Sequence, residues 1–323
     1  LAGIFLILMG LCHFGSLIKF IPYTITTGFT SGIAVTIVIG QLKDFFGVTY
    51  PNGLKPIETM EKLNAFALGF SSFHVDALIV GGVSLAILII SPYIFKRIPG
   101  SLIAVVIGIL MVKFLPLHVS TIGNLYTITN DLPSFHIPAV KFSMVKSAIP
   151  NAFTIAVLAA IESLLSCVVA DGMINDKHRS DTELVAQGLG NIASALFGGI
   201  PATGAIARTA ANIKNGGRTP VAGMVHSITL VIVLVVLMPF AGMIPMPTIA
   251  AILFVVAYNM CQWRTFVHML KTAPKSDIIV LIVTFILTVV FDLVVAIEIG
   301  MVIACLLFIK RMSEETHVDS WVY

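Results

Sequence analysis

The chain has 323 residues, of which 58% are hydrophobic and only 11% are charged, and its mean hydropathy is +1.02. One soluble core could not bury so much apolar surface, so the composition excludes a soluble domain and indicates an integral membrane protein. The formal net charge of +3 says little about partners, and we expect a lipid bilayer rather than nucleic acid around the chain.

Apolar stretches of helical length predict eleven membrane segments. A polar loop over 46–75 includes the start of a short surface helix at 56–61, and a second loop covers 118–147. Residues 263–271 have the pattern of an interfacial amphipathic helix. The segments cover 1–20, 26–45, 76–95, 101–117, 148–173, 182–197 (with Asp181 as its expected cap), 203–214, 219–240, 247–262, 276–295 and 297–309.

The distribution of basic residues supports this map. When the loops are assigned to alternate faces of the membrane, 12 of the 19 Lys and Arg residues lie on one face. The positive-inside rule makes that face cytoplasmic and places the C-terminus there, so we expect a plasma (inner) membrane protein. Cys12, Cys167, Cys261 and Cys305 lie singly in apolar stretches, without metal-site spacing, and we expect neither a metal nor a cofactor.

The segment 203–214 is too short to cross a bilayer, for which a helix needs about 20 residues. Gly-Gly-Ile-Pro at 198–201 and Asn-Gly-Gly at 215–217 break the chain on either side of it. A half-helix that starts near mid-membrane directs unpaired N–H groups and its positive dipole end into the protein, which favours an anion. We therefore predict a substrate site formed by Thr203, Gly204, Ala205, Ile206, Ala207 and Arg208.

Arg208 contributes a permanent positive charge one turn into this half-helix, and an arginine at that depth needs a polar cavity or a partner. A structural salt bridge is the alternative role. Gln187 and Asn191 lie one turn apart on the preceding segment, and we expect them to form hydrogen bonds between helices.

Glu162 lies near the middle of the segment 148–173, and Ser166 follows it at i+4 on the same helix face. A carboxylate at mid-membrane must be neutralised by a proton, a cation or a basic group, and desolvation favours its protonated form. We predict that Glu162 and Ser166 couple transport to an ion; the alternative is a structural carboxylate paired with Arg208 or with backbone N–H groups. Asp171 lies nearer the cytoplasmic end and is expected to be a helix-terminal or gating residue.

A weak internal repeat is also present. Ile-Pro at 21–22 precedes one helix, and Asp76 opens a pair of segments after it; Ile-Pro at 244–245 and Asp277 repeat this order with opposite topology. Inverted repeats of this kind are typical of secondary transporters, whose substrate sites lie where broken helices meet.

Several longer motifs resemble a known family, the SulP anion transporters, called SLC26 in animals. They are ESLLS at 162–166 leading to Asp171, KHR at 177–179, ELVAQG at 183–188, NI at 191–192, FGGIPATGAIART at 197–209, and GFTSG at 28–32 with QL at 41–42. The resemblance covers nearly the whole chain.

The resemblance implies an all-α integral membrane fold of seven plus seven inverted segments, with core and gate domains that work by an elevator motion and form a homodimer in the full-length protein. It implies that this chain starts at the fourth segment and ends after the fourteenth, without the first segments and the cytoplasmic STAS domain. An acid at the position of Glu162 is associated with ion coupling in the family. The expected divisions are a core helix at 1–20, gate helices at 21–117, an extracytoplasmic loop at 118–147, core domain at 148–243, gate helices at 244–312 and the start of a tail at 313–323.

We therefore predict a secondary active anion transporter, a proton symporter of sulfate, bicarbonate or a dicarboxylate. A sodium-coupled bicarbonate transporter and an anion exchanger of the same fold are alternatives. A nucleobase transporter is disfavoured, because its substrate is neutral whereas Arg208 favours an anion. An intramembrane enzyme is not expected, since the sequence has no HExxH, paired membrane aspartates or GxSxG nucleophile motif. A non-transporting sensor or structural protein is the alternative from another class.

Overall fold

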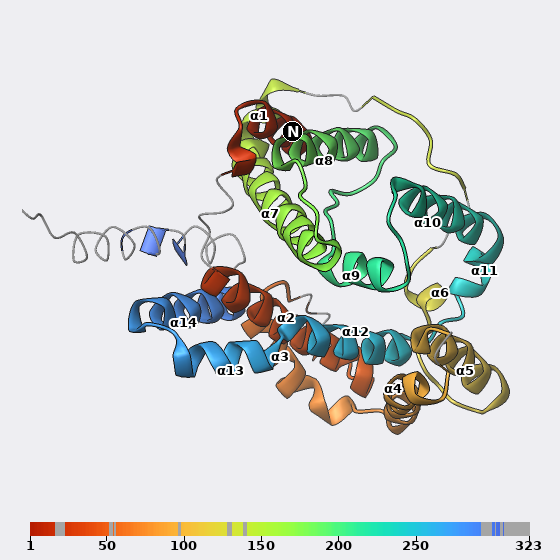
Figure 1. The fold of residues 1–323 in the computed structure, drawn as a ribbon. Coiled ribbons are helices and arrows are strands. Elements are labelled where there is room, and N and C mark those ends of the chain that lie inside the picture. The colour runs from red at the N-terminus through yellow and green to blue at the C-terminus, as the bar shows by residue number, and fades with distance from the viewer. Residues whose placement is uncertain are drawn as a thin grey trace, which may run out of the picture. The chain divides into compact units, whose positions relative to one another are not determined.

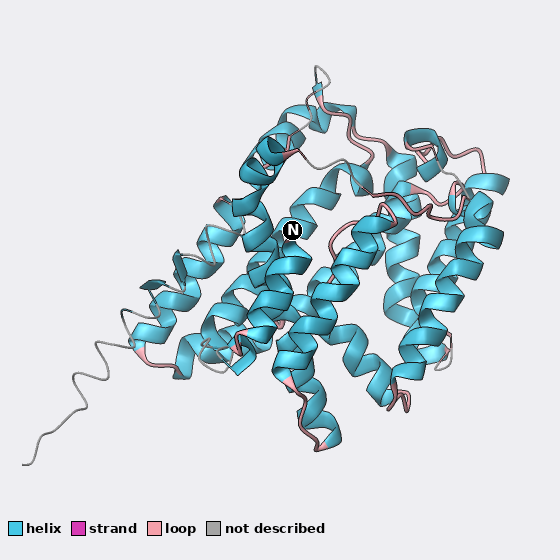
Figure 2. Cartoon of the chain, turned by 90° about the horizontal axis from the view of Figure 1, so that it is seen from above, coloured by secondary structure: helices cyan, strands magenta, loops and turns pink. Residues whose placement is uncertain are grey.

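The structure, a computed structural model, describes residues 1–16, 23–51, 54, 56–95, 98–127, 131–137, 141–291, 299–300, 302–303 and 306. The regular elements of these residues are helices, joined by loops (Figure 2). The chain divides into two compact units, each assembled from two stretches of sequence (Figure 1). Unit 1 comprises Leu1–Ile21 and Thr129–Met238, and unit 2 comprises Pro22–Ile128 and Pro239–Tyr323.

Unit 1 is built around α7 (Phe142–Ile174), which packs against α1 (Ala2–Leu11), α8 (Ser180–Leu196) and α9 (Ile206–Lys214). α1 also lies beside α8 (Figure 1). Small side chains dominate the buried core and let these helices approach closely. The core contains Ala2, Leu6, Ala152, Ala156, Ala159, Ala160, Leu164 and Leu184.

Glycines set the distance between α1 and α8. A Cβ atom added at Gly188 would lie 2.6 Å from the carbonyl oxygen of Gly3, and one added at Gly3 would lie 2.6 Å from the carbonyl oxygen of Gly188. A Cβ atom added at Gly10 would lie 2.7 Å from the carbonyl oxygen of Asp181. Because these neighbours are backbone atoms in packed helices, any side chain at these positions would push the helices apart.

The last helix of unit 1, α10 (Pro220–Ile232), begins with a proline at its first position. It continues through a π-helical turn, Val233–Leu237, into the short α11 (Met238–Ala241), giving a span of 22 residues. The apolar window of this span is not buried against the part of the chain that the structure describes. An apolar helix exposed in this way is typical of one that lipid surrounds.

Unit 2 is organised around α2 (Tyr23–Phe46), which packs against α4 (Val75–Ile94), α12 (Met246–Cys261) and α14 (Lys275–Val290). α4 in turn packs against α5 and α12. The other helices of this unit are α3 (Thr59–Gly69), η3 (Phe70–Ser72), α5 (Gly100–Phe114), α6 (Ile122–Leu125) and α13 (Trp263–Thr272).

Small and polar side chains hold the helices of unit 2 together. A Cβ atom added at Gly28 would lie 2.7 Å from the carbonyl oxygen of Leu281, so α2 and α14 need the glycine at this contact. Ser31 Oγ donates a 2.8 Å hydrogen bond to the carbonyl oxygen of Cys261. The hydroxyl groups of Ser84 and Thr248 join α4 to α12 at 2.9 Å. The contacts of Gly28 and Ser31 show that the small residues at the start of α2 allow close packing.

Five helical stretches are long and apolar enough to cross a membrane, by length and composition. Three of them, Thr24–Phe46, Val75–Ile94 and Pro220–Ala241, match predicted segments to within two residues, because hydropathy over about 20 residues is a strong signal. Phe142–Ile174 begins six residues before the predicted position 148, so the expected loop 118–147 ends earlier than predicted, and Met246–Thr272 joins the predicted segment 247–262 to the helix at 263–271. A helix at 263–271 is also confirmed, as α13. The five stretches are Thr24–Phe46, Val75–Ile94, Phe142–Ile174, Pro220–Ala241 and Met246–Thr272.

Two predictions at helix ends are wrong. Within the described residues, the expected segment 1–20 forms an α-helix over Ala2–Leu11 and is then interrupted by a turn at His13, whose φ is 60°; positions 17–20 lie outside the described residues. Asp181 is not the cap of α8, since Arg179 occupies that position. Its carboxylate instead accepts hydrogen bonds from the Gly15 N–H group, at 3.0 Å, and from His13 Nδ1, at 2.8 Å.

The last predicted segment, 297–309, lies largely outside the described residues, as does 292–295 at the end of 276–295. The core and gate roles given to the parts of the chain stay predictions.

Candidate functional site

The site is formed where the chain leaves α8 and enters the half-helix α9. α8 ends at Leu196, and the chain reverses through Gly198, whose φ of +72° favours glycine. Pro201 to Ala205 then run without helical structure, and α9 begins at Ile206. The predicted start at Thr203 was therefore three residues too early, because side chains of α7 and α8 hold this stretch outside the helix.

Asn191 fixes the start of the extended stretch. Its Oδ1 accepts a 2.8 Å hydrogen bond from the Ala202 N–H group, and its Nδ2 donates a 2.9 Å bond to the Ala202 carbonyl oxygen. Gln187 Nε2 donates to the same carbonyl. Both residues form hydrogen bonds, but the predicted bonds between helices are wrong in their partner, which is the non-helical segment before α9.

α7 holds the other side of the stretch. Thr203 Oγ1 donates a 3.0 Å hydrogen bond to the Ala159 carbonyl oxygen. A Cβ atom added at Gly204 would lie 3.5 Å from Ser163 Oγ, which is ordinary van der Waals contact. One turn into α9, Ser166 Oγ donates to Thr209 Oγ1 at 2.8 Å. Ser166, Thr203 and Gly204 therefore lie close together between α7 and the start of α9.

The backbone N–H groups at the start of α9 have no partner in the part of the chain that the structure describes. Those of Gly204, Ala205, Ile206 and Arg208 donate to no backbone or side-chain acceptor there, and Ala205 provides no side-chain cap. Unpaired N–H groups at a helix start carry partial positive charge and bind anions. This end of α9 is chemically suited to an anion.

Arg208 and Glu162 lie near this end but do not pair. The Arg208 side chain is exposed, and it forms no ion pair within the described residues. Glu162 is half-buried and forms no hydrogen bond or ion pair there. The alternative of a structural salt bridge between them is therefore not supported, and both charges are available to ligands.

A second carboxylate, which the sequence analysis missed, lies beside the site. Ser163 is 1% exposed, and its Oγ donates a 2.7 Å hydrogen bond to Glu183 Oε1 on α8. Glu183 shares a face of α8 with Gln187 and Asn191, at i, i+4 and i+8. This spacing is the signal that could have associated Glu183 with the site.

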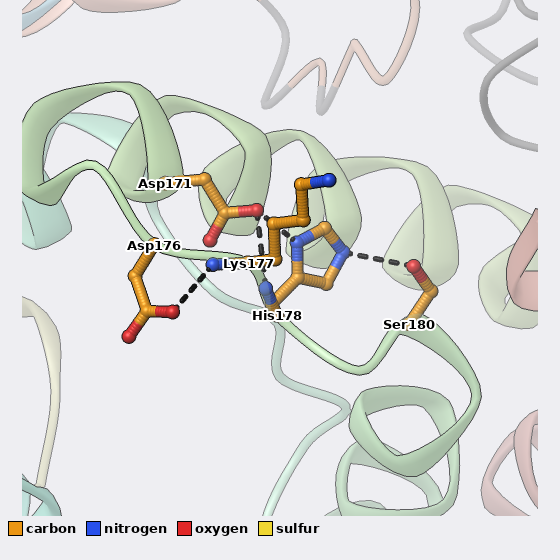
Figure 3. A network of polar contacts seen from close by, with 5 residues as sticks. All are labelled: Asp171, Asp176, Lys177, His178 and Ser180. Atoms are coloured by element: carbon orange, nitrogen blue, oxygen red, sulfur yellow. Dashed lines mark hydrogen bonds and ion pairs between the residues drawn. The ribbon is translucent and has the colours of Figure 1, made fainter.

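The turn between α7 and α8 contains a network of polar contacts (Figure 3). The ring of His178 lies between Asp171 and Ser180: its Nδ1 is 2.7 Å from Asp171 Oδ2, and its Nε2 is 2.9 Å from Ser180 Oγ (Figure 3). The backbone N–H group of His178 also donates to Asp171 Oδ2, at 3.1 Å. Asp171 therefore fixes the turn at the end of α7.

Metal binding finds no support in the geometry. Within the described residues, no group of three His, Cys, Asp or Glu side chains is arranged to hold a metal ion. The oxygen atoms nearest the start of α9 belong to single hydroxyl and carboxylate groups. The absence of a cofactor stays a prediction.

Comparisons with known proteins identify relatives along the whole chain. Residues 1–284 match the model of the sulfate permease family. YvdB of Bacillus subtilis, a candidate sulfate transporter by its name, is 41% identical over 99% of this chain and 60% of its own length. The bicarbonate transporter BicA of a Picosynechococcus strain is 35% identical over 97% of this chain and 55% of its own. The chain thus spans little more than half the length of these relatives.

The fold also matches a solved structure. The transmembrane domain of a cyanobacterial BicA superposes with a TM-score of 0.77 and 30% identity, and the match covers 91% of this chain and 74% of that one. The chain therefore has the all-α, inverted-repeat transporter fold of an integral membrane protein. With the family model matched over most of its length, the chain belongs to the sulfate permease family, also called SulP.

Proposed function

We propose that this chain is part of a secondary active transporter that moves an inorganic or carboxylate anion together with a proton. The observation that carries the proposal is the start of α9, where the N–H groups of Gly204, Ala205, Ile206 and Arg208 have no acceptor among the described residues. A helix start inside a membrane protein supplies positive potential without the hydration that a free cation would retain.

Arg208 adds to this potential, since no described acidic group compensates it in an ion pair. The site therefore favours anions over neutral nucleobases. The names of the relatives suggest sulfate and bicarbonate as candidates, and both are compatible with a site made of N–H donors and one guanidinium.

Glu162 provides the coupling group in this proposal. An ionised carboxylate beside an anion site repels the anion, so proton uptake by Glu162 favours anion binding. Ser166 helps to hold the site, because its hydrogen bond to Thr209 joins α7 to α9. The proposal includes three further parts. The unit that contains the site moves as an elevator and the full-length protein is a homodimer, as the family resemblance implies. The protein lies in the plasma membrane with its C-terminus in the cytoplasm, as the distribution of basic residues indicates.

Uptake into liposomes tests this proposal. The full-length protein would be reconstituted and offered labelled sulfate, bicarbonate and dicarboxylates, with a proton gradient, a sodium gradient or neither. We expect saturable uptake of at least one of these anions, and accumulation against its gradient when only the proton gradient is present.

The other results distinguish the alternatives. Accumulation driven only by sodium would assign Glu162 to a cation site, and exchange that ignores both gradients would indicate an exchanger. Failure to move any anion would leave a sensor or structural protein as the better description.

A further inference from the structure

One face of α7 carries a line of polar side chains from the candidate site to the α7–α8 turn. Ser163, Cys167 and Asp171 occupy successive turns of this face, at i, i+4 and i+8. At the inner end Ser163 contacts the segment around Gly204, and at the outer end Asp171 contacts His178. None of these three residues takes part in the coupling role proposed for Glu162.

Glu183 is the inner acidic group of this line. The Ser163 hydroxyl is buried, and it donates a hydrogen bond to Glu183 Oε1. The second carboxylate oxygen, Oε2, bonds to no group in the described part of the chain, and no basic side chain pairs with it there. Glu183 is half-buried, and one of its two carboxylate oxygens therefore remains open to a further hydrogen bond.

His178 is the outer titratable group. Histidine accepts and releases protons near neutral pH, and a ring bonded at both nitrogens can take a proton on one and lose a proton from the other. In Figure 3 the ring lies between the carboxylate of Asp171 and the hydroxyl of Ser180. The side chains of Asp171 and His178 are only 23% and 19% exposed, so the pair is partly shielded from water.

Other charged groups surround this pair. Asp176, Lys177 and Arg179 lie on the same turn and are exposed. The turn after α1 contributes a second histidine, His13, which pairs with Asp181 at 2.8 Å and whose side chain is 82% exposed. These groups modulate the potential at His178, but none of them belongs to the polar face of α7.

We propose that Glu183 and the Asp171–His178 pair form a proton path between the candidate site and the α7–α8 turn. The inference rests on proton coupling in the proposed function. Eight residues separate Ser163 from Asp171, which is about 12 Å along a helix, so the proposed path requires a chain of water molecules between Glu183 and His178. The O–H bond of protonated Glu183 breaks as that water chain passes a proton to His178, and an N–H bond of His178 then breaks to release a proton to water.

The test uses the full-length protein in liposomes and compares two measurements. Anion homoexchange requires no net proton movement, whereas accumulation driven by a pH gradient does, and a pH dye inside the liposomes reports the protons that enter with the anion. We expect Glu183→Gln and His178→Gln to retain measurable homoexchange but to lose proton-driven accumulation and the dye signal. Ser163→Ala, which removes the hydrogen bond to Glu183, should reduce both coupled signals.

His13→Gln is the matched control, since it removes the other histidine that pairs with an aspartate at this end of α8. It should leave homoexchange and proton-driven accumulation at the parental level. Parental coupling in both Glu183→Gln and His178→Gln would overturn the path while leaving the proposed function intact. A parent protein that exchanges anions but ignores the pH gradient would instead overturn the path together with the proton coupling on which it rests.

Discussion

Asn191 makes two hydrogen bonds to the backbone of a single residue, Ala202, one to its N–H group and one to its carbonyl oxygen. An amide side chain carries the donor and the acceptor that this requires. Asn191 is 9% exposed, so water cannot replace either bond freely. Together with the bonds made by Gln187 and Thr203, this side chain fixes the position of the segment that leads into α9, and hence of its free N–H groups.

Replacement of Asn191 should therefore affect both stability and anion binding. Asn191→Ala leaves the Ala202 backbone groups without these partners, which we expect to cost about 1–3 kcal/mol of stability and to weaken anion binding. Asn191→Asp keeps the acceptor but replaces the donor by a carboxylate oxygen facing the Ala202 carbonyl oxygen and adds a negative charge near the site, so it should also weaken anion binding. Thermal unfolding in detergent and anion affinity would be measured on both variants.

Asn215→Ala is the control for this experiment, because Asn215 is exposed and donates only to the Ala211 carbonyl oxygen at the end of α9. We expect it to change stability by no more than about 0.5 kcal/mol. If Asn191→Ala were as harmless as the control, the two bonds to Ala202 would not determine the site.

Arg208→Gln should weaken anion binding without unfolding the protein. Arg208 is exposed and has no ion-pair partner among the described residues, so its removal leaves no buried charge behind. Loss of one charge-assisted contact costs about 1.5–3 kcal/mol, which is roughly a tenfold to hundredfold increase in Kd. Lys214→Gln, in the last turn of the same helix, is the matched control. Equal Kd values for Arg208→Gln and its parent would refute the assigned role.

Gly188→Ala should destabilise unit 1, whereas Gly190→Ala should not. The added Cβ atom at position 188 would lie 2.6 Å from the Gly3 carbonyl oxygen, while nothing lies within 4 Å at position 190 of the same helix. Overpacking of this kind costs about 1–3 kcal/mol, and alanine is the better helix former by about 1 kcal/mol at an open position. Thermal unfolding should therefore separate the two variants, and similar melting temperatures would contradict the close contact of α1 and α8.

The sequence was a good guide to features that depend on local composition. The helices α4 and α12 each begin within one residue of the predicted position, because a bilayer-length apolar run is recorded along the chain itself. The break before α9 was also predictable, since a glycine such as Gly198 followed by a proline such as Pro201 favours the end of a helix. These signals need no knowledge of distant contacts.

Features that depend on pairing between distant segments were not predictable. Asp181 is a residue type typical of a helix cap and lies where a cap was expected, but the turn after α1 brings His13 and Gly15 to it from 168 and 166 residues away. Glu183 resembles any acidic residue in the first turn of a helix, where the dipole favours it. Only the packing of α8 on α7 places it against Ser163.

Glu162→Gln tests the coupling role, because glutamine mimics the protonated carboxyl group permanently. Glu162 forms no ion pair among the described residues, so the change leaves no basic side chain there without its partner. We expect the variant to bind and exchange anions while losing uphill uptake driven by a pH gradient. Homoexchange and gradient-driven accumulation would be measured in liposomes, as for Glu183.

The comparison of the two acidic positions decides which carboxylate carries the proton. If Glu162→Gln still concentrates the anion when only a proton gradient is supplied, Glu162 is not the carrier. Loss of coupling in Glu162→Gln alone would confine the proton to the site face of α7, where Ser166 contacts Thr209. Loss of proton-driven accumulation in both Glu162→Gln and Glu183→Gln would mean that neither carboxylate supplies the coupling by itself. A proton bound at Glu162 would then also have to pass Glu183.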